Sequence, residues 1–452
     1  MSSIASTASP APLSRLRSES SRRFGLQSIG FLAAAPLLAY MLLGEQMFRF
    51  LACWLAALLC WGVMAFRPRW LADWRQSRLF VICLAYIGYL LASFFWSGNE
   101  QGAFSYYACA AVLALTFIGF LADSQRRDER FEETGLWCVS LVISAAAVCS
   151  LIAYLCSDFY THRLVRFHPL GGMNNPNLGG PVFVLGMWIA YNHLLKTSKT
   201  SKTPIWKTFS GWLAMGQIAL SGIALAQTNS RSSFLALAVM LALAALRLQY
   251  WRLSPNNWRL NLGVWLPSWP DWRLGWLAAA LAVGCVIRYF LIMPFILNQL
   301  AAPAAASPTD NFVRRADNGR FALWKESLDK FQQRPWLGYG LGANMRYWAA
   351  GSYGHIHPHN IQLSCLNTGG VPALLLFWLL MAQMGRTAYR IFQRRGDFFW
   401  LGWLVFVIVC TQFDHYARLD EVNINWFLFW LPCGYLIAAE LREHSQEAPA
   451  PS

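Results

Sequence analysis

Long apolar stretches separated by shorter polar ones constrain this chain more than any other feature. Twelve of them approach the ~20 residues that a helix needs to cross a lipid bilayer. Because lipid offers the backbone no hydrogen-bonding partner, such stretches form helices. The sequence therefore predicts an all-α polytopic membrane protein of about twelve transmembrane helices, at 28–44, 47–66, 79–97, 103–122, 135–157, 178–195, 209–227, 232–248, 275–298, 361–385, 398–413 and 423–440.

The distribution of charge predicts how these helices are oriented. Only 13% of the residues are charged, against about 25% in soluble domains. The net charge of +15 would suit nucleic acid, but 24 of the 37 Lys and Arg lie in the two tails and in alternate loops. That bias marks cytoplasmic segments. We therefore expect both termini in the cytoplasm and no nucleic-acid partner.

This topology divides the chain into five parts. A cytoplasmic tail (1–27) precedes helices one to nine (28–298), a large external loop (299–360), helices ten to twelve (361–440) and a second tail (441–452). Within the loop, apolar side chains recur at helical spacing over 320–333. The spacing predicts an amphipathic helix on the membrane surface, its apolar positions being Phe321, Leu323, Trp324, Leu328 and Phe331.

External arginines are the first candidate site residues. Lys and Arg are normally depleted on this side, yet five arginines gather there. Guanidinium binds phosphate in a bidentate manner, so a phosphate tethered to lipid would explain them. The alternative is binding of anionic lipid headgroups. The residues are Arg163, Arg166, Arg314, Arg315 and Arg320.

Arg231 stands where a short polar turn, Thr228-Asn229-Ser230, becomes an apolar helix. The polar turn favours a ligand-binding role, and the alternative is an arginine that extends to the membrane interface. Arg288 lies deeper in an apolar stretch, and its sequence context leaves its role open.

Three alternating histidines, His355, His357 and His359, close the external loop. Their spacing would allow chelation, but no carboxylate or cysteine among them completes a metal shell, so we expect no metal. A catalytic base is the favoured role, with His359 best placed because Asn360 and a transmembrane helix follow it. Asp414 and Asp420 are alternatives as the base or as residues that orient His359, and pairing with the arginines is an equal alternative for them.

These motifs together resemble the O-antigen ligase/polymerase superfamily. The resemblance rests on Thr228-Asn229-Ser230-Arg231, on Gly319-Arg320, on Arg334-Pro335-Trp336-Leu337-Gly338-Tyr339-Gly340 and on His359-Asn360 with Gly370 eleven residues on. The turn Asn175-Pro176-Asn177 is also similar. Each motif alone is weak, but their order and spacing extend over nearly the whole chain.

The resemblance implies a metal-independent glycosyltransferase of the GT-C type in the bacterial inner membrane, with no cofactor and, we expect, monomeric. In its O-antigen ligase branch, a glycan on undecaprenyl diphosphate is transferred at the periplasmic face to a sugar hydroxyl of lipid A-core. Arg231 and His359 match functional positions of the family, and Arg320 matches a third basic one. Arg163, Arg166, Arg314 and Arg315 would widen the anion-binding site.

The residue chemistry agrees with this reaction. A lipid diphosphate is a good leaving group and needs charge stabilisation, which arginines supply. One base is then enough, and an imidazole with a pKa of about 6.5 suits it. Direct attack predicts inversion at the anomeric carbon. The alternatives are an O-antigen polymerase, a protein O-oligosaccharyltransferase and, from another class, a flippase or transporter, which would favour repeated halves that this sequence lacks.

Overall fold

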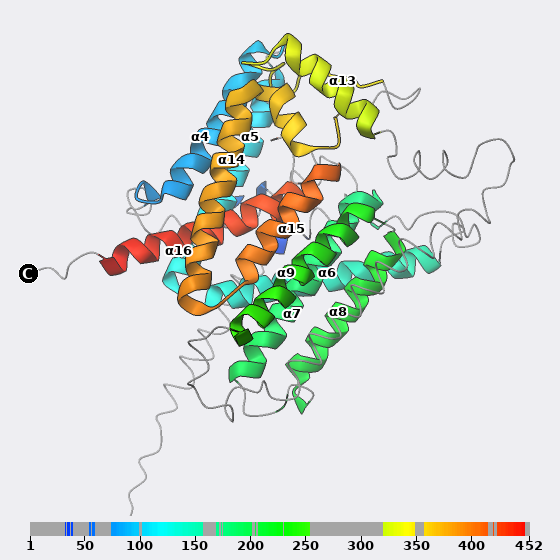
Figure 1. Ribbon diagram of the computed structural model, residues 1–452, viewed down its shortest axis with the longest axis vertical. Helices are drawn as coiled ribbons and strands as arrows, with labels where there is room; N and C mark the ends of the chain where they lie inside the picture. Colours follow the sequence, from blue (N-terminus) through cyan, green and yellow to red (C-terminus); the bar gives the residue numbers. More distant parts are fainter. Residues whose placement is uncertain are drawn as a thin grey trace, which may run out of the picture.

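The computed structural model describes residues 74–98, 102–156, 169–170, 173, 175–200, 204, 207–228, 230–253, 320–348, 357–414, 419 and 423–447, with isolated positions between 32 and 58. The regular elements discussed below are helices (Figure 1). They are α4 (Arg78–Ser93), η1 (Phe94–Trp96), α5 (Gly102–Arg127), α6 (Arg130–Leu155), α7 (Pro176–Thr200), α8 (Phe209–Thr228), α9 (Arg231–Leu253), α13 (Arg320–Gln333), α14 (Ile361–Arg395), α15 (Phe399–Asp414), η7 (Trp426–Trp430) and α16 (Leu431–Glu447).

The described helices agree with most of the predicted spans. The spans predicted between 79 and 248, and those after 361, each fall on a described helix or pair of helices. By length and hydropathy, six helices of the described part are candidate membrane spans, and 231–242 and 399–413 are shorter apolar helices. The spans predicted at 28–44, 47–66 and 275–298 lie outside the described residues, apart from isolated positions in the first two. The protein is thus a multi-pass helical membrane protein, and the count of twelve stays a prediction.

α14 is longer than its predicted span and is broken in the middle. It runs to Arg395 rather than 385, and the left-handed Gly396 ends it. At Gly369 and Gly370 the backbone leaves helical geometry, with φ of −131° and +68°. Pro372 follows and lacks the N–H of a regular turn. The hydroxyl of Tyr89 in α4 donates to the freed carbonyl of Gly369 at 2.7 Å.

Contacts along α7 establish which helix ends lie together. Trp188 Nε1 donates to Phe399 O at 3.1 Å, so the C-terminal half of α7 lies beside the start of α15. Eight residues earlier, ~12 Å along the helix, Gly180 packs against Ser230 and Ser233 at the start of α9. α9 and α15 lie side by side (Figure 1). The starts of α7 and α9 therefore lie at the same end of the helical body as the C-terminus of α15.

The start of α14 joins the same end. Asn360, directly before α14, donates through Nδ2 to Gln412 O near the end of α15, at 3.2 Å. Gln362 Nε2 also donates to Gln412 Oε1, at 2.9 Å. We call this end of the molecule, with the starts of α7, α9 and α14 and the end of α15, the site end.

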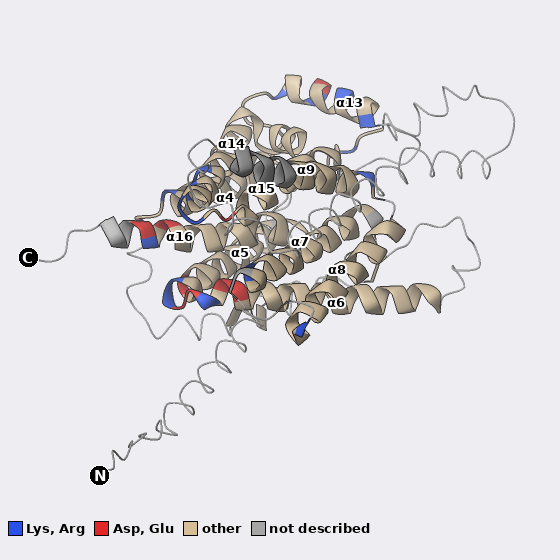
Figure 2. Ribbon diagram, turned by 60° about the horizontal axis from the view of Figure 1, so that its bottom comes forward, with Lys and Arg blue, Asp and Glu red and all other residues tan. Residues whose placement is uncertain are grey.

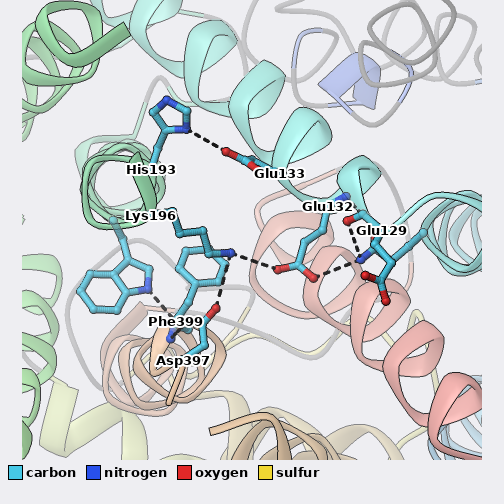
Figure 3. A network of polar contacts seen from close by, with 9 residues as sticks. Glu129, Glu132, Glu133, His193, Lys196, Asp397 and Phe399 are labelled. Carbon is cyan, nitrogen blue, oxygen red and sulfur yellow. Dashed lines mark hydrogen bonds and ion pairs between the residues drawn. The ribbon is translucent and has the colours of Figure 1, made fainter. Parts of the chain in front are cut away.

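The opposite end carries a network of charged side chains (Figure 3). Lys196 Nζ in α7 lies 3.4 Å from Asp397 and 3.8 Å from Glu132 in α6. His193 contacts Glu133 at 3.5 Å. Figure 2 shows charged residues on α13 and near the ends of α5, α14 and α16, with long uncharged stretches between them. This distribution is that of helices which cross an apolar layer.

Candidate active site

α13 has the bounds that the apolar spacing predicted, 320–333. Its packing differs from the predicted single apolar face. Leu323 and Ser327 are buried, whereas Phe321 is 67% and Leu328 44% exposed. The reason is that α13 docks on α14 through a polar contact, in which Asn367 Nδ2 donates to Ser327 O and Oγ. Phe321 and Leu328 point away from the protein, and their placement on the membrane surface stays a prediction.

The segment after α13, residues 334–341, docks into the break of α14, and we call it the clamp loop. Tyr339 N donates to Asn367 O at 2.7 Å, and Gly340 N to Thr368 O at 2.8 Å. In return, Val371 N donates to Pro335 O at 2.9 Å. Because the break exposes backbone groups of α14, the clamp loop satisfies them in place of helical partners.

α4 and η1 hold the clamp loop from its other side. Leu341 N donates to Ser93 Oγ at 3.0 Å, and Trp96 Nε1 donates to Leu337 O at 2.8 Å. The clamp loop therefore joins three helices and fixes the C-terminal end of α13 relative to α14.

Glycines make this close approach possible. Gly338 has φ of +63° and Gly340 of +91°, values that favour glycine. A Cβ on Gly338 would lie 2.7 Å from Asn367 O, and one on Gly340 would lie 2.5 Å from Ser93 O. The clamp loop and Gly370, which the sequence marks only as motif residues, thus hold the site in place. Sequence reasoning did not pair them, although glycines in both segments were a usable signal.

His359 packs against His357 and directly precedes the residue that caps α14. Its φ of +52° is unusual for a residue with a side chain. Its backbone N–H donates to His357 Nδ1 at 3.3 Å, and the two rings are 4.2 Å apart. Asn360 then caps α14, since its Oδ1 accepts from Gln362 N and Leu363 N at 2.9 and 3.1 Å. Asn360, which the sequence suggests as a possible supporting residue, thus fixes the start of α14, and its role in the site stays a prediction.

Arg320 reaches the same place from α13. Its guanidinium carbon lies 5.9 Å from the centroid of the Phe413 ring, at the end of α15. One turn later, Trp324 packs its ring against Phe413 at 6.4 Å and donates from Nε1 to Pro358 O at 3.1 Å. Arg320 and the segment that carries His359 thus meet around the end of α15.

Arg231 is the first residue of α9, at the site end. Thr228 and Ser230 form the polar turn before it, with Ser230 N donating to Thr228 Oγ1 at 3.3 Å. The Ser230 hydroxyl lies 2.8 Å from that of Ser233. These contacts are internal to the turn, and they leave Arg231 partly exposed.

Several predicted site residues, or their side chains, lie outside the described part of the chain. Asp414 is the last residue of α15, at the site end, but its side chain is not among those described. No group of three or more His, Cys, Asp and Glu in the described residues could hold a metal. Since His355 is not among them, the expected metal independence stays a prediction. The predicted residues outside the described part are Arg163, Arg166, Arg314, Arg315, His355 and Asp420.

The charges at the site end favour an anion. Helix starts carry a partial positive charge, and α7, α9 and α14 all start here. Arg231 and Arg320, each the first residue of its helix, add positive charge where it is least favourable for the helix itself. An anionic ligand would relieve this repulsion. Fold and site therefore define a class, multi-pass helical membrane proteins with a basic site at one end of the helical body.

Comparison with known proteins is more specific. A family model described as O-antigen ligase matches residues 217–378, a range that includes Arg231, Arg320 and His359. The O-antigen ligase of Pseudomonas aeruginosa PAO1 is 25% identical over 381 residues, which cover 83% of this chain and 81% of that protein. The chain is therefore similar to the O-antigen ligase family over these ranges.

Proposed function

We propose that this protein is an O-antigen ligase of the bacterial inner membrane. It transfers a polysaccharide from undecaprenyl diphosphate to a sugar hydroxyl of lipid A-core, at the periplasmic face. The observation that carries the proposal is the gathering of His359, Arg320 and Arg231 at one end of the helical body, all within the range matched by the family model. With this orientation, both termini lie in the cytoplasm.

In the proposed reaction, the arginines bind the leaving group. The acceptor hydroxyl oxygen attacks the anomeric carbon, and the bond from that carbon to the diphosphate oxygen breaks. The electron pair leaves with the diphosphate, whose growing negative charge Arg231 and Arg320 stabilise. Guanidinium suits this role because it stays charged and offers a fork of donors to phosphate oxygens.

His359 takes the proton of the acceptor hydroxyl. The backbone around His359 supports this role. The hydrogen bond of its N–H to His357 and the helix cap at Asn360 fix the chain on both sides of the proposed base. With one base and direct attack, the product has the inverted anomeric configuration. No metal takes part in the steps proposed.

Other residues have secondary roles in this proposal. Arg163, Arg166, Arg314 and Arg315 extend the anion site around the diphosphate. Asp414 and Asp420 orient His359, and either would replace it as base if His359 proved dispensable.

The testing experiment is glycan transfer by purified protein in detergent, with EDTA present. The donor is a polyprenyl-diphosphate glycan, offered in parallel with lipid A-core, with a second donor molecule and with a Ser-containing protein. We expect transfer to lipid A-core, inversion and no loss on chelation. Elongation of the donor alone would indicate a polymerase, and transfer to protein an O-oligosaccharyltransferase. No transfer in detergent, with movement of the donor across the membrane when the protein is reconstituted in vesicles, would indicate a flippase. Loss with EDTA and rescue by a divalent ion would contradict metal independence.

A further inference from the structure

Phe413 at the end of α15 is a shared platform for two side chains of α13. Arg320 and Trp324 are four residues apart, so they project from the same face of the helix. The Arg320 guanidinium lies over the Phe413 ring at 5.9 Å, and the Trp324 ring tilts against it at 6.4 Å. A cation above an aromatic face and an aromatic pair are both weakly attractive. The platform therefore fixes where the first turn of α13 lies on α15.

Trp324 also reaches the segment of the proposed base. Its indole N–H donates to Pro358 O at 3.1 Å, in the residue that directly precedes His359. The following residue, Asn360, is tied to α15 through Gln412, one position before Phe413. His359 is thus held on one side by α13 and on the other by α15. Trp324, a residue of α13, contacts both the segment of His359 and α15.

We propose that Trp324 is a positioning residue that fixes the distance between the Arg320 guanidinium and His359. The inference rests on the proposed function, in which those two groups act on opposite sides of one anomeric carbon. Trp324 needs no contact with substrate for this role. It fixes the position of Arg320 in α13 relative to His359 in the loop before α14. Such a contact is needed because α13 ends at Gln333, so the two residues do not share one helix.

The need for such a residue follows from the backbone around His359. A positive φ outside glycine is strained and persists only where the surroundings hold it. The His357 contact is local and lies within two residues, so it shapes the turn without fixing its place relative to α13. The Trp324 hydrogen bond supplies that second constraint.

The experiment compares Trp324→Phe, which keeps a ring against Phe413 but loses the N–H donor, with Trp324→Leu, which loses both. Trp348→Phe is the matched control, because that indole belongs to the same external segment and is 55% exposed. Initial rates are measured over a range of donor concentrations, and amide hydrogen exchange is followed in the segment 357–363.

We expect kcat to fall ~10- to 100-fold in Trp324→Phe with the donor KM little changed, because small misplacements of catalytic groups act on the transition state. Amide exchange at 357–363 should rise in the same variant and stay unchanged in Trp348→Phe. Trp324→Leu combined with Phe413→Leu should cost less than the sum of the single effects, since both act through one geometry.

Two outcomes would overturn the assignment separately from the function. An active wild type with an unchanged kcat in Trp324→Phe would remove the positioning role and leave the ligase intact. Unchanged exchange at 357–363 would show that the indole does not hold this segment. A wild type that transfers no glycan would instead overturn the proposed function, and this assignment with it.

Discussion

The positions of Arg231 and Arg320 at helix starts could be predicted from the sequence, but their contacts could not. Arg231 was recognisable in the sequence because a polar turn precedes it at the start of an apolar helix, and Arg320 because arginines are normally depleted in external segments. The structure places both at helix starts, as expected. The support of Arg320 by Phe413 was not foreseeable, because 93 positions separate the two in the sequence and no local pattern links them.

Replacing either arginine by lysine should test the phosphate role. We expect Arg231→Lys and Arg320→Lys each to lower kcat/KM for the donor by ~10- to 100-fold, because a lysine keeps the charge but loses the bidentate fork. Arg346→Lys, an exposed position in the same segment (320–348) as Arg320, is the control. Equal activity in all three variants would contradict the bidentate role. It would mean that the diphosphate needs only a positive charge at these positions, or that it contacts neither residue.

At the scale of elements, the apolar pattern predicted where helices lie but not the contacts between them. The bounds of α13 followed from helical spacing, and Asn360 is a residue type that often precedes a helix. The break of α14 and its occupation by the clamp loop did not follow from periodicity. Hydropathy averages over a window and cannot register a single left-handed glycine, so the predicted span at 361–385 showed no break.

The clamp loop should not tolerate a Cβ at its glycines. Gly338→Ala adds a carbon 2.7 Å from Asn367 O at a φ of +63°, so we expect it to destabilise the fold by ~1–3 kcal/mol or more. Gly88→Ala in α4 is the control, because a Cβ there meets nothing within 4 Å and a helical alanine is neutral or stabilising. Thermal unfolding in detergent measures both. A Gly338→Ala protein as stable as wild type would show that the loop is not held as described.

For the whole molecule, hydropathy located the helices that the structure describes, because their apolar stretches are long and the charges lie between them. It did not predict which ends meet. Lys196 is one of the 24 basic residues from which the cytoplasmic segments were predicted, yet it also joins α6 and α7 to the loop before α15 through Glu132 and Asp397. The gathering of Arg231, Arg320 and His359 likewise depends on packing between helices distant in sequence. For these three residues, the family resemblance supplied what periodicity could not.

The central claim is that His359 accepts the proton of the acceptor hydroxyl. The most direct measurement is glycan transfer to lipid A-core by His359→Ala beside wild type, with His193→Ala, a histidine in the charged network at the opposite end, as the matched control. We predict a loss of at least ~100-fold in kcat for His359→Ala, with an intact fold and transfer preserved in the control. Near-normal transfer by folded His359→Ala would contradict the account and make Asp414 or Asp420 the next candidate for the base.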